Sequence, residues 1–274
     1  RDSNISALNT HRNLAFNNTE AGKNLEKLSS GYKINRAGDD AAGLSISEKM
    51  RGQIRGLEMA SKNAQDGISL IQTTEGALNE VHSILQRMRE LTVQGANDTN
   101  VTADRTSIAD EIDQLNQEIV RIKDTTEFNT KKVLDSSAGT VNFQVGANTA
   151  QTMSFDFATA GIDLSDVATG TTKTTLDVTD HANATASIAL VDAELVKVSA
   201  GRSLLGAAQN RLEHTINNLG ASAENLTASE SRIRDTDMAK EMMGFSKNNI
   251  LMQAAQSMLA QANQQPQGVL QLLQ

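Results

Sequence analysis

The chain has 274 residues, 33 of them acidic and 25 basic, so its formal net charge is −8 at pH 7. It contains no cysteine, one proline and 3% aromatic residues. The lack of cysteine excludes disulfides, zinc–cysteine sites and cysteine nucleophiles. The acidic balance argues against nucleic-acid binding, and without a run of 18 apolar residues we expect a soluble chain with no membrane span. So few aromatics favour long helices packed in narrow bundles.

The first 40 residues predict an amphipathic helix followed by a turn. Such a helix cannot bury its apolar stripe alone, so we expect it to become ordered only on assembly. Gly38-Asp39-Asp40 then predicts a tight turn at the start of the next helix. The large apolar side chains at loose helical spacing are Ile5, Leu8, Leu14, Phe16, Leu25, Leu28, Tyr32 and Ile34.

The spacing of apolar residues predicts two further helices. Over residues 41–96 they recur every seven positions, at Met50, Leu57, Ala64, Ile71, Leu78 and Leu85. From Asp104 to Asp124 they recur at spacings of four and three, at Ile108, Ile112, Leu115, Ile119 and Ile122. The intervening residues 95–100 have turn composition, and Thr102 and Asp104 are both candidate caps for the third helix.

The pattern changes from helix to strand after Phe128. Apolar and polar residues alternate from Val141 to Val145, and again from Met153 to Phe157 beyond a turn over residues 146–151, which predicts a β-hairpin at about 140–158. Residues 161–185 are rich in Thr, Ala and Asp and have little periodicity. We expect a short, variable, exposed outer loop there.

A further long helix is the strongest pattern in the sequence. Arg202, Gln209 and Glu230 interrupt its second stripe. We expect residues 186–234 to pack with residues 41–160 in a mainly α fold, an antiparallel, coiled-coil-like helical rod that carries the hairpin. Seven consecutive positions at a period of seven are apolar: Val191, Val198, Leu205, Leu212, Leu219, Leu226 and Ile233.

Residues 235–274 resemble the first 40 in composition. Leu251, Ala255, Met258 and Ala262 follow helical spacing, and we expect this segment also to be disordered in the monomer. Pro266 predicts an interruption of the tail. Five methionines at roughly helical spacing favour adaptable packing between subunits over a promiscuous binding groove: Met238, Met242, Met243, Met252 and Met258.

No catalytic, metal or cofactor site is predicted, so we expect a protein that is not an enzyme. The four histidines, His11, His82, His181 and His214, lie in different predicted elements and lack metal-ligand spacing. One strip remains open to two interpretations. Residues 86–94 place Arg87, Glu90, Leu91 and Gln94 on one helix face, either as a solvated face or as a partner surface.

Several long motifs closely resemble bacterial flagellins, the filament subunits of the flagellum. The resemblance covers nearly the whole chain except about 161–185. The motifs are LSSGYKINRAGDDAAGL at 28–44, MRGQIRGL at 50–57, FQVGAN in the predicted hairpin at 143–148, NRLEHTINNL at 210–219 and AQANQQP at 260–266.

The resemblance implies a subunit that is exported unfolded through the flagellar type III apparatus, without a cleaved signal peptide. It would polymerise with itself beneath the filament cap into an extracellular filament for motility. Residues 1–40 and 235–274 would form paired helices in the filament core. Implied partners also include an export chaperone and the hook-filament junction protein. The assembly contacts would be Leu8, Leu25, Leu251, Met258 and Leu270.

Some flagellins are bound by the vertebrate toll-like flagellin receptor in innate immune recognition. Carried over by motif, the contact positions in this chain are Arg87, Leu91, Glu111 and Arg211.

Two alternatives remain at this point. A hook-filament junction protein would share the paired terminal helices but form a short ring, and residues 263–266 favour a flagellin. A coiled-coil enzyme or adaptor would need a site, and none is found. The start Arg1-Asp2-Ser3-Asn4-Ile5 departs from the family's usual Met-x-Ile-Asn, and Gln274 stands where Arg is common.

Overall fold

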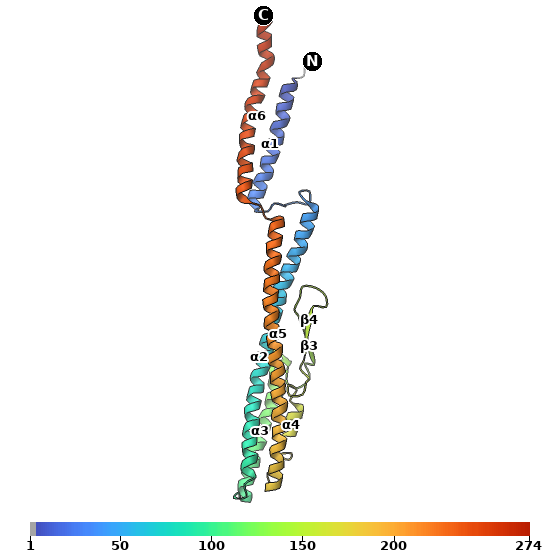
Figure 1. Ribbon diagram of the computed structural model, residues 1–274, viewed down its shortest axis with the longest axis vertical. Coiled ribbons are helices and arrows are strands. Elements are labelled where there is room, and N and C mark those ends of the chain that lie inside the picture. Colours follow the sequence, from blue (N-terminus) through green and yellow to red (C-terminus); the bar gives the residue numbers. More distant parts are fainter. Residues whose placement is uncertain (1–3) are drawn as a thin grey trace. The chain divides into compact units, whose positions relative to one another are not determined.

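The computed structural model describes residues 4–274, so residues 1–3 of the divergent start lie outside the described residues. The chain forms two compact units: a terminal unit, Arg1–Ile54 with Glu224–Gln274, and a central unit, Arg55–Ala223. Helices and two small antiparallel sheets make up the described part, which confirms the predicted mainly α fold (Figure 1). None of the helices within residues 4–274 is long and apolar enough to cross a bilayer.

Long helices build the core of the central unit. They are α3 (Thr102–Thr125) and the larger parts of α2 (Ala41–Gly95) and α5 (His181–Arg234). The Asp104 carboxylate accepts a hydrogen bond from the Val101 N–H at 3.0 Å, as expected for a residue in the first turn of α3. The predicted seven-residue repeats meet in one core. Its fully buried members include Ile71, Leu78, Leu85, Ile112, Ile119, Val191, Val198, Leu205 and Leu212.

The predicted hairpin is present in the central unit. Strands β3 (Thr140–Gln144) and β4 (Thr152–Asp156) are antiparallel, and Phe143 lies opposite Met153 in the buried row. A second, smaller pair of strands, β1 (Glu127–Phe128) and β2 (Lys131–Lys132), was not predicted. Its turn residues Asn129 and Thr130 have φ values of 49° and 64°, a conformation that Thr rarely adopts.

The prediction of an exposed loop over residues 161–185 is wrong. The segment contains a short helix, α4 (Ser165–Gly170), and contributes a set of buried apolar side chains. The Asn116 side chain of α3 donates hydrogen bonds to the Ala168 carbonyl at 2.8 Å and to Thr171 Oγ1 at 3.0 Å. Because the packed backbone is irregular, its apolar residues follow no period. They are Ile162, Leu164, Val167, Ala168, Leu176 and Val178.

Two glycines seat this packed segment on α5. Gly161 adopts a φ of 93°, and a Cβ at Gly201 would lie 2.7 Å from both the carbonyl carbon and the oxygen of Gly161. Real Cβ atoms do not approach other atoms so closely. The backbone of the segment therefore rests directly on the backbone of the helix.

In the terminal unit, α1 (Ile5–Ser30) and α6 (Met238–Leu272) pack side by side (Figure 1). The Asn4 side chain caps the start of α1, and Asp237 caps α6 by accepting hydrogen bonds from the N–H groups of residues 239 and 240. Gly31 ends α1 in the left-handed conformation. Both helix starts and the end of α1 are thus encoded locally.

Pro266 does not interrupt the tail as predicted, because α6 continues through it to Leu272. A proline inside a helix leaves the carbonyl four residues earlier without its N–H partner. That carbonyl belongs to Ala262, and the Asn4 side chain donates a hydrogen bond to it at 2.8 Å. The N-cap residue of α1 therefore replaces the hydrogen bond that the proline removes.

The terminal unit also contains a cluster of polar contacts between α2, α5 and the segment that follows α1. Glu230 is buried and accepts hydrogen bonds from Ser47 Oγ and Arg51 Nε, each at 3.0 Å. The Tyr32 ring faces the guanidinium groups of Arg51 and Arg234, each 4.9 Å from its centroid. Glu230, which appears in the sequence as an interruption of the apolar stripe, is thus a satisfied buried acceptor.

Candidate functional site

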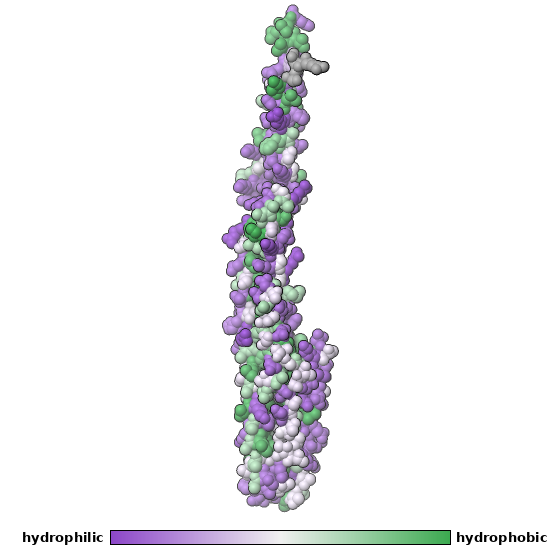
Figure 2. Space-filling view, turned by 90° about the vertical axis from the view of Figure 1, so that its right-hand side faces the viewer, coloured by the Kyte–Doolittle hydropathy of each residue, from purple (hydrophilic) through white to green (hydrophobic). Residues whose placement is uncertain are grey.

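The terminal helices expose more large apolar side chains than a soluble helix pair needs to. We call this surface the terminal face. On α1 it consists of Ile5, Leu8, Phe16 and Leu25, and on α6 of Met238, Met242, Met243, Ile250, Leu251, Met258, Val269, Leu270 and Leu272. Only small residues, Ala21, Ala255 and Ala262, are buried within the two helices. Figure 2 shows apolar patches among the polar residues over these helices.

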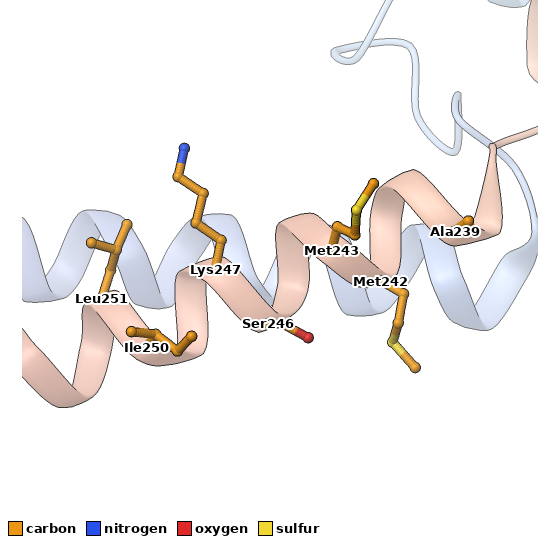
Figure 3. A pocket seen from close by; sticks show the side chains of 7 residues that line it. All are labelled: Ala239, Met242, Met243, Ser246, Lys247, Ile250 and Leu251. Atoms are coloured by element: carbon orange, nitrogen blue, oxygen red, sulfur yellow. The ribbon is translucent and has the colours of Figure 1, made fainter.

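Part of the terminal face forms a shallow groove of about 590 Å³ along α6 (Figure 3). Its residues recur three or four positions apart, so they form two adjacent rows on one side of the helix. Lys247 and Ser246 are the two polar residues of an otherwise apolar lining. The groove is lined by Ala239, Met242, Met243, Ser246, Lys247, Ile250 and Leu251.

All five residues predicted as assembly contacts are exposed in the terminal unit. Leu8 and Leu25 lie on α1, and Leu251, Met258 and Leu270 lie on α6. Three further residues of the same face were not predicted as contacts: Ile5, Phe16 and Ile250. The exposed positions of α1 do not form one regular stripe, so periodicity alone did not separate them from buried positions.

A second candidate surface lies on the central unit, around Arg87 on α2. Arg87 makes a two-pronged contact with Glu111 on α3, with Nε to Oε1 at 2.9 Å and Nη2 to Oε2 at 3.3 Å. It also donates to Glu90 at 3.1 Å. All three side chains are exposed. The hydrogen bond to Glu111, and then that to Glu90, raises the pKa of Arg87, so the cluster keeps one fixed cation between two carboxylates.

The structure corrects one residue of the proposed receptor surface. Leu91 is buried in the central core, with 1% of its surface exposed, and so cannot contact a partner in this conformation. It lies four residues beyond Arg87, on the side of α2 that meets the core rather than on the exposed strip. Arg211 on α5 is exposed.

Among the described residues, no group of three or more His, Asp or Glu side chains could hold a metal ion. The features that gather on these surfaces are apolar contact area and exposed ion pairs.

Comparison with known proteins assigns the chain to a family. Residues 2–139 match the bacterial flagellin N-terminal helical region and residues 188–273 the bacterial flagellin C-terminal helical region. The chain is 62% identical over 270 residues to a flagellin of Halalkalibacterium halodurans and 58% identical over 298 residues to one of Bacillus subtilis, in both cases over 98% of each chain. The crystal structure of Bacillus cereus flagellin is similar, with a TM-score of 0.51 and 33% identity over 62% of this chain and 94% of that one. The chain therefore belongs to the bacterial flagellin family, whose members are structural proteins of the flagellar filament and not enzymes.

Proposed function

We propose that this chain is a motility filament subunit that polymerises outside the cell through its terminal face. The observation that supports this most directly is the set of exposed leucines, isoleucines and methionines on α1 and α6. Burying one such side chain against a neighbour contributes about 1.5–3 kcal/mol. When identical subunits bury unlike surfaces against each other in an arrangement that does not close, a helical polymer results.

We further propose that the terminal segments fold as they assemble. Within the helix pair only alanines are buried, so the apolar area removed from water in the monomer is small compared with the conformational entropy lost on ordering. Residues up to about 40 and from about 235 would then be disordered in the free monomer. A chain in that state suits export, unfolded and without a cleaved signal peptide, through the type III apparatus with an export chaperone, followed by addition beneath the filament cap.

Seeded polymerisation tests the assembly proposal. Wild-type protein is expected to form filaments visible by electron microscopy above a critical concentration. Leu251→Asp should raise that concentration at least about tenfold, because it places a charge on the buried side of a contact. Gln253→Asp, which adds the same charge at an exposed position outside the groove, serves as the matched control. Wild-type protein that stays monomeric, or equal effects of the two variants, would overturn the proposal.

Hydrogen exchange on the monomer tests the folding proposal separately. The central unit is expected to be protected, whereas residues 5–30 and 245–270 should exchange as an unfolded chain does. Strong protection of the terminal segments in the monomer would contradict coupled folding while leaving polymerisation itself untouched.

The family match to filament flagellins favours a long filament over the short ring of a hook-filament junction protein. Electron microscopy of the same seeded samples separates the two, because a junction protein would add only a short layer to a seed. In the filament, the junction protein would be the partner at the proximal end.

A receptor contact through the Arg87 cluster is a second proposal, which an exposed two-pronged ion pair supports. Arg87→Ala should weaken binding to the ectodomain of the vertebrate toll-like flagellin receptor by about tenfold or more, as for a central arginine of an interface. Arg121→Ala removes a similar exposed pair, with Glu118, and is the control. Unchanged binding by Arg87→Ala would remove Arg87, Glu111 and Arg211 as assigned contacts.

A further inference from the structure

We propose that the methionines of the terminal face are an oxidation site that decides whether a free subunit can polymerise. The effect on polymerisation rests on the proposed function. Five of the nine methionines lie in α6. Four of these are more than half exposed: Met238 at 51%, Met242 at 56%, Met243 at 67% and Met258 at 62%. An exposed thioether is open to peroxides, and its oxidation makes an apolar side chain polar.

The other methionines provide an internal contrast. Met88 and Met153 are buried in the central core, with 0% and 5% of their surface exposed, so a peroxide cannot reach them while that core is folded. Met59 is exposed at 56% but lies on α2, outside the terminal face. Exposure and location are therefore separated within one chain.

The groove on α6 is where oxidation would do most harm. Figure 3 shows Met242 and Met243 projecting from adjacent positions in different directions, so that they contribute to both rows of the lining. Ile250 and Leu251 continue the same apolar lining. Methionine suits such a surface because its flexible thioether fills an irregular contact. The thioether is also the group that a peroxide oxidises, so each of the two rows contains an oxidisable residue.

The chemistry is an oxygen-atom transfer from hydrogen peroxide or an organic peroxide. The O–O bond breaks, an S–O bond forms at Sδ, the sulfur loses two electrons, and the peroxide is reduced to water or an alcohol. The sulfoxide oxygen is a strong hydrogen-bond acceptor. Covering it with the apolar surface of a neighbouring subunit would leave that acceptor without a donor, which costs binding free energy.

Polymerisation would also protect the same atoms. Once a neighbour covers the terminal face, the thioethers of α6 are no longer open to peroxide. The site is thus vulnerable in the free subunit and shielded in the filament. Damaged subunits would fail to add, while filaments already formed would stay intact.

The experiment treats wild-type monomer with limited hydrogen peroxide, maps sulfoxides by peptide mass spectrometry and measures the critical concentration for seeded growth. Met242, Met243 and Met258 are expected to react well before Met88 and Met153. Oxidised subunits should need about tenfold more protein to polymerise. Peptide methionine sulfoxide reductases for both epimers, with a thiol reductant, should restore the original value. In preformed filaments, oxidation of α6 should be at least about tenfold slower.

Two variants locate the effect. A quadruple Met238→Leu, Met242→Leu, Met243→Leu, Met258→Leu chain keeps apolar residues of similar size and should polymerise after peroxide treatment nearly as before it. Met59→Leu should remain as sensitive as wild type. Failure of untreated wild-type protein to polymerise would count against the proposed function. Normal growth of oxidised wild-type subunits, absence of rescue by the reductases, or equal loss in the quadruple variant would instead overturn the oxidation site.

Discussion

The central unit and the terminal helix pair are both built from amphipathic helices, but they differ in whether the apolar side chains of those helices are buried. In the central unit, Leu78 and Leu205 are fully buried against residues of the same chain. On the terminal face, Leu8 and Leu270 are more than half exposed. The difference shows that amphipathic spacing in the sequence does not by itself say whether the folded monomer buries its apolar positions. The central unit buries its apolar side chains within the chain, whereas under the proposed function the terminal pair buries its own against a neighbouring subunit.

The largest effect that would test this contrast comes from truncating one leucine in each region. Leu205→Ala should lower the free energy of unfolding of the monomer by about 2–5 kcal/mol, because it opens a cavity in a packed core. Leu251→Ala should change it by less than about 0.5 kcal/mol, since the side chain has no packed surroundings in the monomer. Urea titrations of both variants give the two values. Losses of similar size would mean that the terminal pair already has a core of its own.

The packing of residues 157–179 on α5 offers the next test. Gly201→Ala should destabilise the monomer by about 1–3 kcal/mol, because the new methyl group meets the backbone of Gly161. Hydrogen exchange should increase over residues 157–179. Gly206→Ala, also in α5, adds a methyl group into open space and should stabilise the helix by about 0.5–1 kcal/mol. If both substitutions stabilise the protein, the segment does not rest on α5 in solution.

A smaller effect is expected at the contact between Asn4 and the carbonyl that Pro266 leaves unpaired. Asn4→Asp keeps the oxygen that caps α1 but removes the amide donor to Ala262. In the wild-type background, Asn4→Asp should destabilise the filament. In the Pro266→Ala background the cost should be about 0.5–1 kcal/mol smaller, because the restored N–H of residue 266 can satisfy the Ala262 carbonyl. Thermal depolymerisation of the four filaments gives this coupling. Strictly additive costs would show that the two residues act independently.

The smallest predicted effect concerns the turn at Asp135 and Ser137, whose hydrogen bonds are made entirely within the central unit. The Ser137 side-chain hydroxyl and its backbone N–H donate to the Asp135 carboxylate, and the hydroxyl is the main cause of its lowered pKa. The turn should keep its full stabilisation above the ordinary aspartate pKa near 3.9 and lose it as the pH falls through the lower folded value. Ser137→Ala should move the carboxyl titration measured by NMR upwards, whereas Ser137→Thr should leave it low. Equal midpoints in all three proteins would exclude the hydroxyl as the cause.

Local chemistry in the sequence determined the long helices of this protein and the larger of its two hairpins. The seven-residue repeats that include Ile71 and Val198 predicted the helices of the core, and the alternation around Phe143 predicted the hairpin. These signals are readable because a regular backbone repeats its buried positions at a fixed period. The helical spacing of Leu251 and Met258, which are exposed on α6, could be recognised for the same reason.

The tertiary structure alone decided what depends on contacts between distant segments. Val167 and Leu176 lie in a packed but irregular segment, so no period marks them as buried. Leu91 lies next to an exposed ion pair in the sequence, but the packing of α2 turns it into the core. Pro266 stays within a helix because Asn4, 262 residues earlier, supplies the missing hydrogen bond. In each case the deciding atom comes from a part of the chain that the local sequence does not contain.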